Sequence, residues 1–238
     1  MTDRSEILIL GSGVIGLSCA YFLARAGHEV TILDQGAPGC GSSHGNCGTI
    51  TPSHAPPLPK PGMVRQALRW MLSADAPFYV RPRLDPELWR WLLAFAQRCN
   101  WQDFERALRP KASILKASRL MLAEIITREH IECEFEASGH LTVFRDPAAL
   151  DAFAWWPKAL RDVDIEVHAL DGAQLRAREP ALRDEVIGGY DTPGDAQLRP
   201  DLYVAGLVQV LTRMGVRILP DTRITGFRRD GERVAAVQ

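Results

Sequence analysis

Several features that mark particular classes of protein are missing from this sequence of 238 residues. No apolar run reaches the roughly 20 residues that a membrane-spanning helix needs. The most apolar later stretch, 89–96, is short and is interrupted by Arg90. The stretch 7–10 is too short for the core of a signal peptide, and acidic Asp3 and Glu6 stand where a basic flank would belong. The sequence therefore predicts neither a secretion signal nor a membrane span.

An excess of either charge is missing too. The 28 Lys and Arg residues nearly balance the 29 Asp and Glu residues, and the arginines are scattered rather than gathered in one basic stripe. Nucleic acid is therefore not an expected partner. The five cysteines are odd in number and form no Cys-x-x-Cys pair, which argues against a disulfide framework and against a thiolate metal site. This use of cysteine favours a cytoplasmic protein.

The beginning of the chain has the pattern of a strand–helix–strand unit. The apolar run 6–10 predicts a strand, apolar residues at helical spacing predict a helix over 17–26, and 28–34 predicts a second strand. These elements fit within the roughly 30 residues of a βαβ unit. We therefore expect an α/β fold that opens with a Rossmann-like lobe.

A glycine-rich motif lies between the first strand and the helix. Gly11-Ser12-Gly13-Val14-Ile15-Gly16 matches G-x-G-x-x-G, and Asp34 ends the second strand at about the spacing of an acid that binds a ribose. Gly11 would permit the tight turn, Gly13 would let the backbone approach a pyrophosphate, and Gly16 would let the helix pack on the strand. The free N–H groups and the positive dipole at the start of the helix favour phosphate. A carboxylate at Asp34 disfavours NADP relative to NAD or FAD.

The next segment, 35–62, is a long loop rich in Gly, Ser, Pro and Asn. Long loops inside compact domains are commonly functional or disordered, and the glycines here favour a function. The part 41–50 carries small residues whose hydrogen-bond donors could crowd against a pyrophosphate, a ribitol or a flavin edge. It favours FAD, because an NAD-binding fold would usually continue with alternating strands and helices. An NAD-dependent dehydrogenase stays an alternative.

The rest of the chain predicts a helical insertion and part of a second lobe with a mixed sheet. Helices are expected over 65–73, 86–102, 113–130, 147–159, 171–179 and 200–214. Strands are expected over 132–136, 140–144, 166–170, 216–219, 222–228 and 233–237. Gly139 suits a hairpin between the first two strands, Asp230-Gly231 suits a turn between the last two, and 188–196 predicts a glycine-rich turn. Because the last strand runs to Gln238 without a cap or a polar tail, we expect a longer protein.

These residues resemble a known family, the FAD-dependent oxidoreductases that include D-amino acid dehydrogenase, glycine oxidase and sarcosine oxidase. The likeness to bacterial D-amino acid dehydrogenases covers nearly the whole chain and is carried by 7–34, 46–62, 66–71, 139–145 and 188–237. It implies an FAD-binding βαβ unit with a flavin-side loop at 1–62. A helical insertion and a partial substrate lobe would follow at 63–199, and the chain would return to the FAD-binding lobe at 200–238.

The resemblance also implies a cofactor site. The pyrophosphate of FAD would be held by Gly11, Ser12, Gly13, Val14, Ile15 and Gly16, and the adenosine ribose by Asp34 and Gln35. The ribitol and flavin side would be formed by Ser42, Ser43, Asn46, Cys47, Gly48, Thr49 and Ile50. Ile224 would contact adenine through a strand backbone, although a plain buried strand residue fits that position equally. No metal ligand is expected.

The implied reaction is the oxidative deamination of a small amino acid or amine. A hydride equivalent passes from the α-carbon to flavin, and water hydrolyses the imino acid to an oxo acid and ammonia. Small D-amino acids such as D-alanine fit the resemblance best, and glycine, sarcosine and hydroxyproline stay open. The arginine that commonly clamps the substrate carboxylate would lie in the further part of the protein, so no catalytic residue is assigned. A non-catalytic remnant that binds flavin weakly or not at all is the other alternative.

Two features lie outside this site. His44 and His54 could accept a proton near a flavin, but a plain loop role explains both more simply. Trp70, Trp89, Trp91 and Trp101, interleaved with arginines, could contact the inner face of a membrane and deliver electrons to a quinone or another acceptor. Ordinary helix packing explains the same tryptophans.

Overall fold

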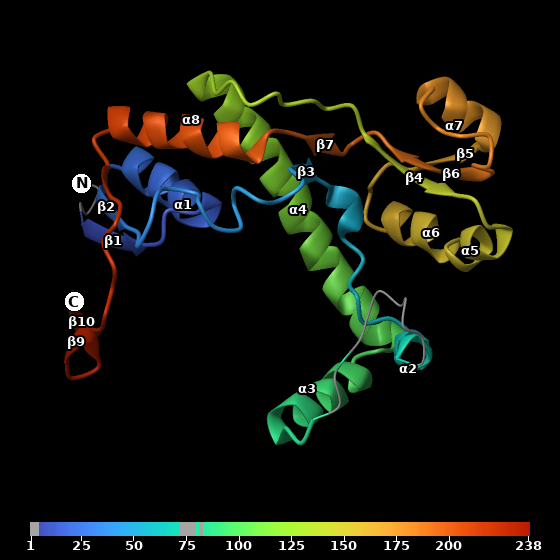
Figure 1. The fold of residues 1–238 in the computed structure, drawn as a ribbon, viewed down its shortest axis with the longest axis horizontal. Helices are drawn as coiled ribbons and strands as arrows, with labels where there is room; N and C mark the ends of the chain where they lie inside the picture. The colour runs from blue at the N-terminus through green and yellow to red at the C-terminus, as the bar shows by residue number, and fades with distance from the viewer. Residues whose placement is uncertain (1–4, 72–79, 81–82) are drawn as a thin grey trace. The chain divides into compact units, whose positions relative to one another are not determined.

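The computed structural model describes residues 5–71, 80 and 83–238. By their contacts these residues form two compact units (Figure 1). Unit 1 is built from the described residues of Met1–Ile50, Leu122–Glu136 and Gln197–Gln238, and unit 2 from those of Thr51–Met121 and Ala137–Ala196.

The helices are α1 (Val14–Arg25), the 3-10 helix η1 (Pro52–His54), α2 (Met63–Trp70), α3 (Pro86–Gln97), α4 (Trp101–Glu129), α5 (Pro147–Ala152), α6 (Trp155–Arg161), α7 (Gly172–Arg178) and α8 (Pro200–Arg213). The strands are β1 (Glu6–Leu10), β2 (Glu29–Leu33), β3 (Thr49–Ile50), β4 (His140–Phe144), β5 (His168–Asp171), β6 (Gly188–Thr192), β7 (Ala196–Gln197), β8 (Arg217–Leu219), β9 (Phe227–Asp230) and β10 (Arg233–Val237).

Unit 1 begins with the predicted strand–helix–strand unit. β1 and β2 pair in parallel, with Leu10 opposite Leu33, and β8 pairs in parallel with the other edge of β2. α1 begins at Val14, three residues before the predicted start, because the end of the glycine motif already forms its first turn. Beyond the helix, Gly27 takes a positive φ of 91°, a conformation that costs glycine little. The parallel sheet and its connecting helix are the Rossmann-like arrangement that the sequence predicts.

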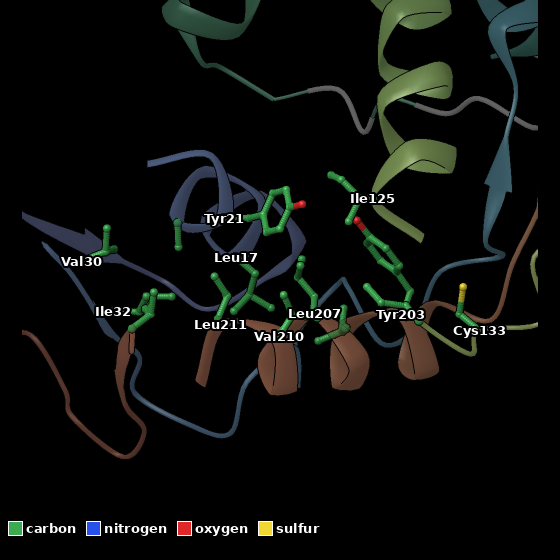
Figure 2. Close-up of a cluster of buried hydrophobic side chains, with 14 residues drawn as sticks. Leu17, Tyr21, Val30, Ile32, Ile125, Cys133, Tyr203, Leu207, Val210 and Leu211 are labelled. Atoms are coloured by element: carbon green, nitrogen blue, oxygen red, sulfur yellow. The ribbon is translucent and has the colours of Figure 1, made fainter. Parts of the chain in front are cut away.

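The core of unit 1 lies between α1, α8 and one face of this sheet (Figure 2). Leu17 and Tyr21 of α1 and Leu207 and Leu211 of α8 are all fully buried there. Burying a side chain of this size stabilises the fold by roughly 1.5–3 kcal/mol. The end of α4 and the segment after it also pack into this cluster, through residues that include Ile125, Ile131 and Cys133.

The end of unit 1 partly follows the prediction. β9 and β10 form an antiparallel hairpin with Asp230 opposite Arg233, so the predicted turn at Asp230-Gly231 is confirmed. The predicted strand 222–228 was wrong over most of its length, because β9 begins only at Phe227. The N–H of Thr222 donates to the carbonyl oxygen of Asp34 at 2.7 Å, and that of Thr225 donates to Gln238 at 2.7 Å. These backbone groups are therefore committed to separate contacts instead of one strand ladder.

The sheet of unit 2 differs from the predicted hairpin. β6 is its central strand and pairs antiparallel with β4 on one side and β5 on the other. The predicted turn over 188–196 was therefore wrong for residues 188–192, all of which are buried. A Cβ on Gly189 would lie 2.1 Å from the carbonyl oxygen of Thr142, so the glycine permits close strand packing here.

The predicted strand 132–136 was also wrong. Within that segment Glu136 forms a single antiparallel bridge with Gln197, while Glu134 has a positive φ of 51°. A left-handed residue of this kind interrupts an extended strand. The segment therefore contributes one bridge to unit 1 and no strand to a hairpin.

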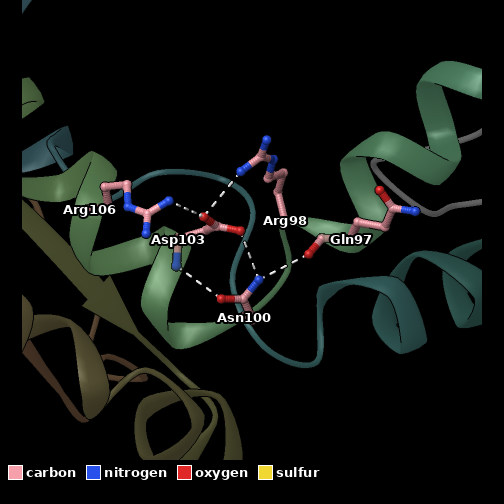
Figure 3. Close-up of polar contacts among 5 residues, drawn as sticks. All are labelled: Gln97, Arg98, Asn100, Asp103 and Arg106. Atoms are coloured by element: carbon pink, nitrogen blue, oxygen red, sulfur yellow. Dashed lines mark hydrogen bonds and ion pairs between the residues drawn. The ribbon is translucent and has the colours of Figure 1, made fainter.

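Asn100 decides where α3 and α4 meet (Figure 3). Its amide oxygen accepts a hydrogen bond from the Asp103 N–H at 2.9 Å, the arrangement of a helix N-cap, and its amide nitrogen donates to the Gln97 carbonyl at 3.0 Å. The predicted helix 86–102 is therefore two helices. The predicted helix 113–130 begins twelve residues too late, because α4 starts at Trp101 and continues through Pro110.

Aromatic side chains fill the core of unit 2. Trp156 and Tyr190 are buried with their ring centroids 5.7 Å apart, and Phe153 lies 5.2 Å from the Trp156 ring. The predicted helix 147–159 is divided at Phe153 into α5 and α6. α7 follows its prediction and begins with a capping box between Asp171 and Gln174.

The two units divide the chain at other points than the predicted segments 1–62, 63–199 and 200–238. The first stretch of unit 1 ends at Ile50, and Leu122–Glu136 joins the same unit because Ile125 and Ile131 are buried in its core. The functions assigned to the three segments stay predictions. Among the described residues, no helix combines the length and the apolar character that crossing a membrane requires.

Candidate cofactor-binding site

The glycine motif forms a tight turn between β1 and α1. The Gly11 N–H donates to the Leu33 carbonyl oxygen at 2.7 Å, and Gly11 has a φ of 105°, which an L side chain rarely adopts. A Cβ on Gly16 would lie 2.0 Å from the carbonyl oxygen of Gly11. The geometry therefore requires glycine at both ends of the motif, for the turn and for close packing of the helix start on the strand.

Asp34 lies just after β2 and is held by the motif. Its Oδ2 accepts hydrogen bonds from the backbone N–H of Ser12 at 2.6 Å and from the Ser12 hydroxyl at 2.7 Å, while Oδ1 accepts from the Gly36 N–H at 3.1 Å. Burial alone would raise the pKa of the Asp34 carboxyl, but these hydrogen bonds outweigh it and hold the pKa below its usual value. Asp34 is therefore an ionised, oriented acceptor beside the start of α1.

Ser12 has a role in this structure that the motif did not predict. Its side chain is fully buried and donates its hydroxyl proton to Asp34. Ser12 thus orients the carboxylate, and the contact with a pyrophosphate expected of it stays a prediction.

Part of the following loop returns to the start of α1. The Ser43 hydroxyl oxygen accepts a hydrogen bond from the Val14 N–H at 2.9 Å, and the Gly39 N–H donates to the Ser12 carbonyl oxygen at 3.0 Å. A Cβ on Gly13 would lie 3.1 Å from the Ser43 hydroxyl oxygen. The structure therefore brings Ser43 beside the glycine motif, while Ile15 stays 78% exposed at the first turn of the helix.

The remainder of the loop is held by its own polar groups. The Asn46 amide oxygen accepts from the Gly48 N–H at 2.8 Å, and its amide nitrogen donates to the carbonyl oxygens of Ser42 and Ser43. Gly48 has a φ of 66°, and a Cβ there would lie 2.0 Å from the Leu198 carbonyl oxygen. The sequence pattern gave no sign of this packing between Gly48 and the segment before α8.

The other predicted residues are less closely joined to the motif. Cys47 is exposed, and the hydrogen bond between its thiol and the Thr49 hydroxyl, 3.6 Å long, lowers the pKa of the thiol. Gln35 is exposed and Ile50 is half-buried. Ile224 is half-buried in a segment without regular secondary structure, so its predicted place in a strand was wrong. Its contact with adenine stays a prediction, supported by the Thr222 hydrogen bond that ties this stretch to Asp34.

These residues fit a dinucleotide with a pyrophosphate and an unphosphorylated ribose. At the start of α1 the Val14 N–H already donates to the Ser43 hydroxyl oxygen, so a pyrophosphate bound to that N–H would take the place of Ser43. The Asp34 carboxylate can accept hydrogen bonds from ribose hydroxyls. A cavity of about 340 Å³ lies beside the loop in unit 1, and His44 lines it. Its other lining residues belong to the loop and to α8 and are Pro38, Gly39, Asp201, Val204, Ala205, Val208 and Gln209.

Comparison with known proteins agrees with this geometry. A model of the family described as "FAD dependent oxidoreductase" matches residues 6–238. A D-amino acid dehydrogenase of Azorhizobium caulinodans is 34% identical over 237 residues, which cover 98% of this chain and 57% of that protein. A D-amino acid dehydrogenase of Phenylobacterium zucineum is 35% identical over 240 residues, covering 98% of this chain and 56% of its own length. The chain thus spans little more than half the length of the relatives that it matches.

Among solved structures, glycine oxidase from Bacillus cereus aligns with a TM-score of 0.64 at 19% identity, covering 99% of this chain and 51% of that one. At this identity the likeness shows the fold alone.

Proposed function

This chain belongs to the family of FAD-dependent oxidoreductases, and from that premise we propose that it binds FAD and serves the oxidative deamination of a small amino acid. The proposal is carried by one observation, the Asp34 carboxylate that Ser12 orients beside the glycine turn. The D-amino acid dehydrogenases that match almost the whole chain support a small D-amino acid as the substrate.

The residues that would hold FAD are those already brought together around the start of α1. Gly11, Gly13 and Gly16 would admit the pyrophosphate to the first backbone N–H groups of the helix, together with Val14 and Ile15. Asp34 would accept the ribose hydroxyls, with Gln35 beside it. The loop residues Ser42, Ser43, Asn46, Cys47, Gly48, Thr49 and Ile50 would line the ribitol and flavin side.

Bound FAD would take the hydride equivalent from the substrate α-carbon, and water would hydrolyse the resulting imino acid to an oxo acid and ammonia. The residues of this chain bind and orient. Gly48 and Asn46 fix the shape of the loop, and Ser43 fixes its distance from the motif. An NAD-dependent dehydrogenase is the less favoured function, because the matching family uses FAD.

The first experiment is the visible absorption spectrum of the purified chain after incubation with FAD and desalting, recorded before and after anaerobic addition of D-alanine. We expect the chain to retain oxidised flavin, because the site has both the glycine turn and the oriented carboxylate. Bleaching by D-alanine, with L-alanine as the control, would support the proposed reaction. Retention without bleaching would leave a flavin-binding chain without turnover, and loss of flavin on desalting would contradict the proposal.

The electron acceptor is proposed to be a quinone or another acceptor at a membrane surface. All twelve residues of α3 are at least partly exposed, and Trp89, Trp91 and Leu93 are 50%, 59% and 64% exposed. Exposed aromatic and aliphatic side chains with an arginine such as Arg90 between them suit the interface of an anionic bilayer. We propose a cytoplasmic protein that contacts the inner face of the membrane through α3.

A further inference from the structure

A buried carboxylate joins three segments of unit 2 that are far apart in the sequence. Asp195 is fully buried, its Oδ1 accepts the Ser53 N–H at 3.1 Å, and its Oδ2 accepts the Ser53 hydroxyl at 2.5 Å. Oδ2 also accepts the Thr192 hydroxyl at 2.9 Å, and the Asp195 carbonyl oxygen accepts the Gly139 N–H at 3.2 Å. Asp195 therefore fixes η1, the start of β4 and the end of β6 against one another.

Two histidines are held side by side by these contacts. His54 follows Ser53 in η1, His140 follows Gly139 at the start of β4, and their ring centroids lie 5.8 Å apart at an interplanar angle of 78°. The hydrogen bonds among the described residues use no ring nitrogen of either histidine. Both rings therefore have donors and acceptors to offer a ligand.

A third potential cation comes from α4. The Lys111 ammonium donates to the backbone carbonyl oxygen of His54 at 3.0 Å, which uses one of its three protons. His54 of η1 thus lies close to His140 of β4 and to Lys111 of α4. Among the described residues that act electrostatically on His54, Asp195 is the carboxylate, and its two oxygens are already bonded to Ser53 and Thr192.

The electrostatics of this cluster favour an added negative charge. Burial lowers the pKa of His54, and repulsion by His140 lowers it further. Asp195 opposes them with a smaller effect, and repulsion by Lys111 adds the least. An anion between these groups would relieve the repulsion. It would also accept hydrogen bonds from the two imidazoles.

The geometry points to a carboxylate-binding subsite formed by His54, His140 and Lys111. The ligand is the carboxylate of a small organic acid. The subsite is built without any residue of the glycine motif, so the two sites can be tested separately.

The test is an NMR titration of the histidine ring protons of the full chain without flavin, in the presence of propionate or of its neutral analogue propionamide at equal ionic strength. We expect propionate to raise the pKa of His54 by about one unit, because a negative charge within bonding distance favours the imidazolium. Since binding raises this pKa, the affinity for propionate should fall as the pH rises through it. The other four of the six histidines serve as internal controls.

Two variants locate the effect. His140→Gln should reduce the propionate-induced rise at His54, whereas His168→Gln, which removes another histidine of unit 2, should leave the rise unchanged. An equal response of all six histidines, or an equal response to propionamide, would overturn the subsite. The titration needs neither bound FAD nor turnover. The subsite can therefore fail this test while the proposed function stands, and the proposed function can fail its own test while the subsite stands.

Discussion

At the scale of single residues, Asp34 shows why the type of residue alone does not define a site. Burial disfavours the ionised form of this carboxylate, and three hydrogen bonds from Ser12 and Gly36 favour it. The hydrogen bonds prevail, so the carboxylate is ready to accept a ribose. A serine fully buried within the motif supplies two of these three bonds.

Replacing Asp34 by Asn should weaken FAD binding by at least about tenfold, because a hydrogen bond to a charged group contributes roughly 1.5–3 kcal/mol and 1.4 kcal/mol corresponds to tenfold. The measurement is quenching of flavin fluorescence. Gln35→Ala, at the neighbouring exposed position, is the comparison variant and should have the smaller effect. Equal affinities for the wild-type chain and Asp34→Asn would remove Asp34 from the site.

The same substitution predicts a pH dependence of stability. The folded chain lowers the pKa of Asp34, so the ionised group stabilises the fold above its unfolded pKa of about 3.9. This stabilisation is lost as the pH falls through the lower folded pKa. Circular dichroism measures the melting temperatures of the wild type and of Asp34→Asn. The difference between them should be largest near neutral pH and become smaller in acid.

At the scale of elements, glycine caused the largest error of prediction. The glycines at 188 and 189 resemble those of a turn, but β6 is the buried central strand of the sheet in unit 2. The backbone of β4 passes so close to Gly189 that a side chain there would meet it. Asn100 is the opposite case, because one side chain ends α3 and begins α4 where hydrophobic periodicity runs on.

Gly189→Ala should lower the free energy of unfolding of unit 2 by about 2–3 kcal/mol, since overpacking typically costs roughly 1–3 kcal/mol and here the contact is with backbone. Tryptophan fluorescence during urea unfolding is the suitable measurement, because all six tryptophans, at 70, 89, 91, 101, 155 and 156, belong to unit 2. Gly194→Ala is the matched control, because a Cβ at Gly194 meets nothing within 4 Å. Similar unfolding curves for the two variants would contradict the packing argument.

At the scale of the whole molecule, the chain passes twice from unit 1 to unit 2 and back. Each unit has its own core, one mainly aliphatic around α1 and α8 and the other rich in aromatic rings. Unit 1 contains the candidate flavin site, and unit 2 contains both the exposed helix α3 and the histidine pair.

The double substitution Trp89→Ala and Leu93→Ala should reduce the fraction of the chain that sediments with vesicles containing phosphatidylserine. Both side chains are exposed and lie on one face of α3, four residues apart, so their removal should leave the fold intact. The matched control is Leu120→Ala, which removes a side chain that is 70% exposed on α4. Unchanged sedimentation of the double variant, or an equal loss in the control, would refute the membrane contact.

The sequence by itself determined the strand–helix–strand unit, the glycine turn, the acid at the end of β2 and the family resemblance. All of these depend on spacing within about 30 residues of a βαβ unit, which periodicity and turn chemistry govern locally. It also determined the hairpin at Asp230-Gly231, because a two-residue turn is a local feature.

Only the tertiary structure decided which distant residues meet. Ser53 and Asp195 are 142 residues apart in the sequence, and their hydrogen bonds place His54 beside His140. Gly189 is a strand residue because the backbone of Thr142 lies against it. Such contacts follow from how the elements pack, and packing depends on the whole set of buried surfaces rather than on the pattern of any one segment.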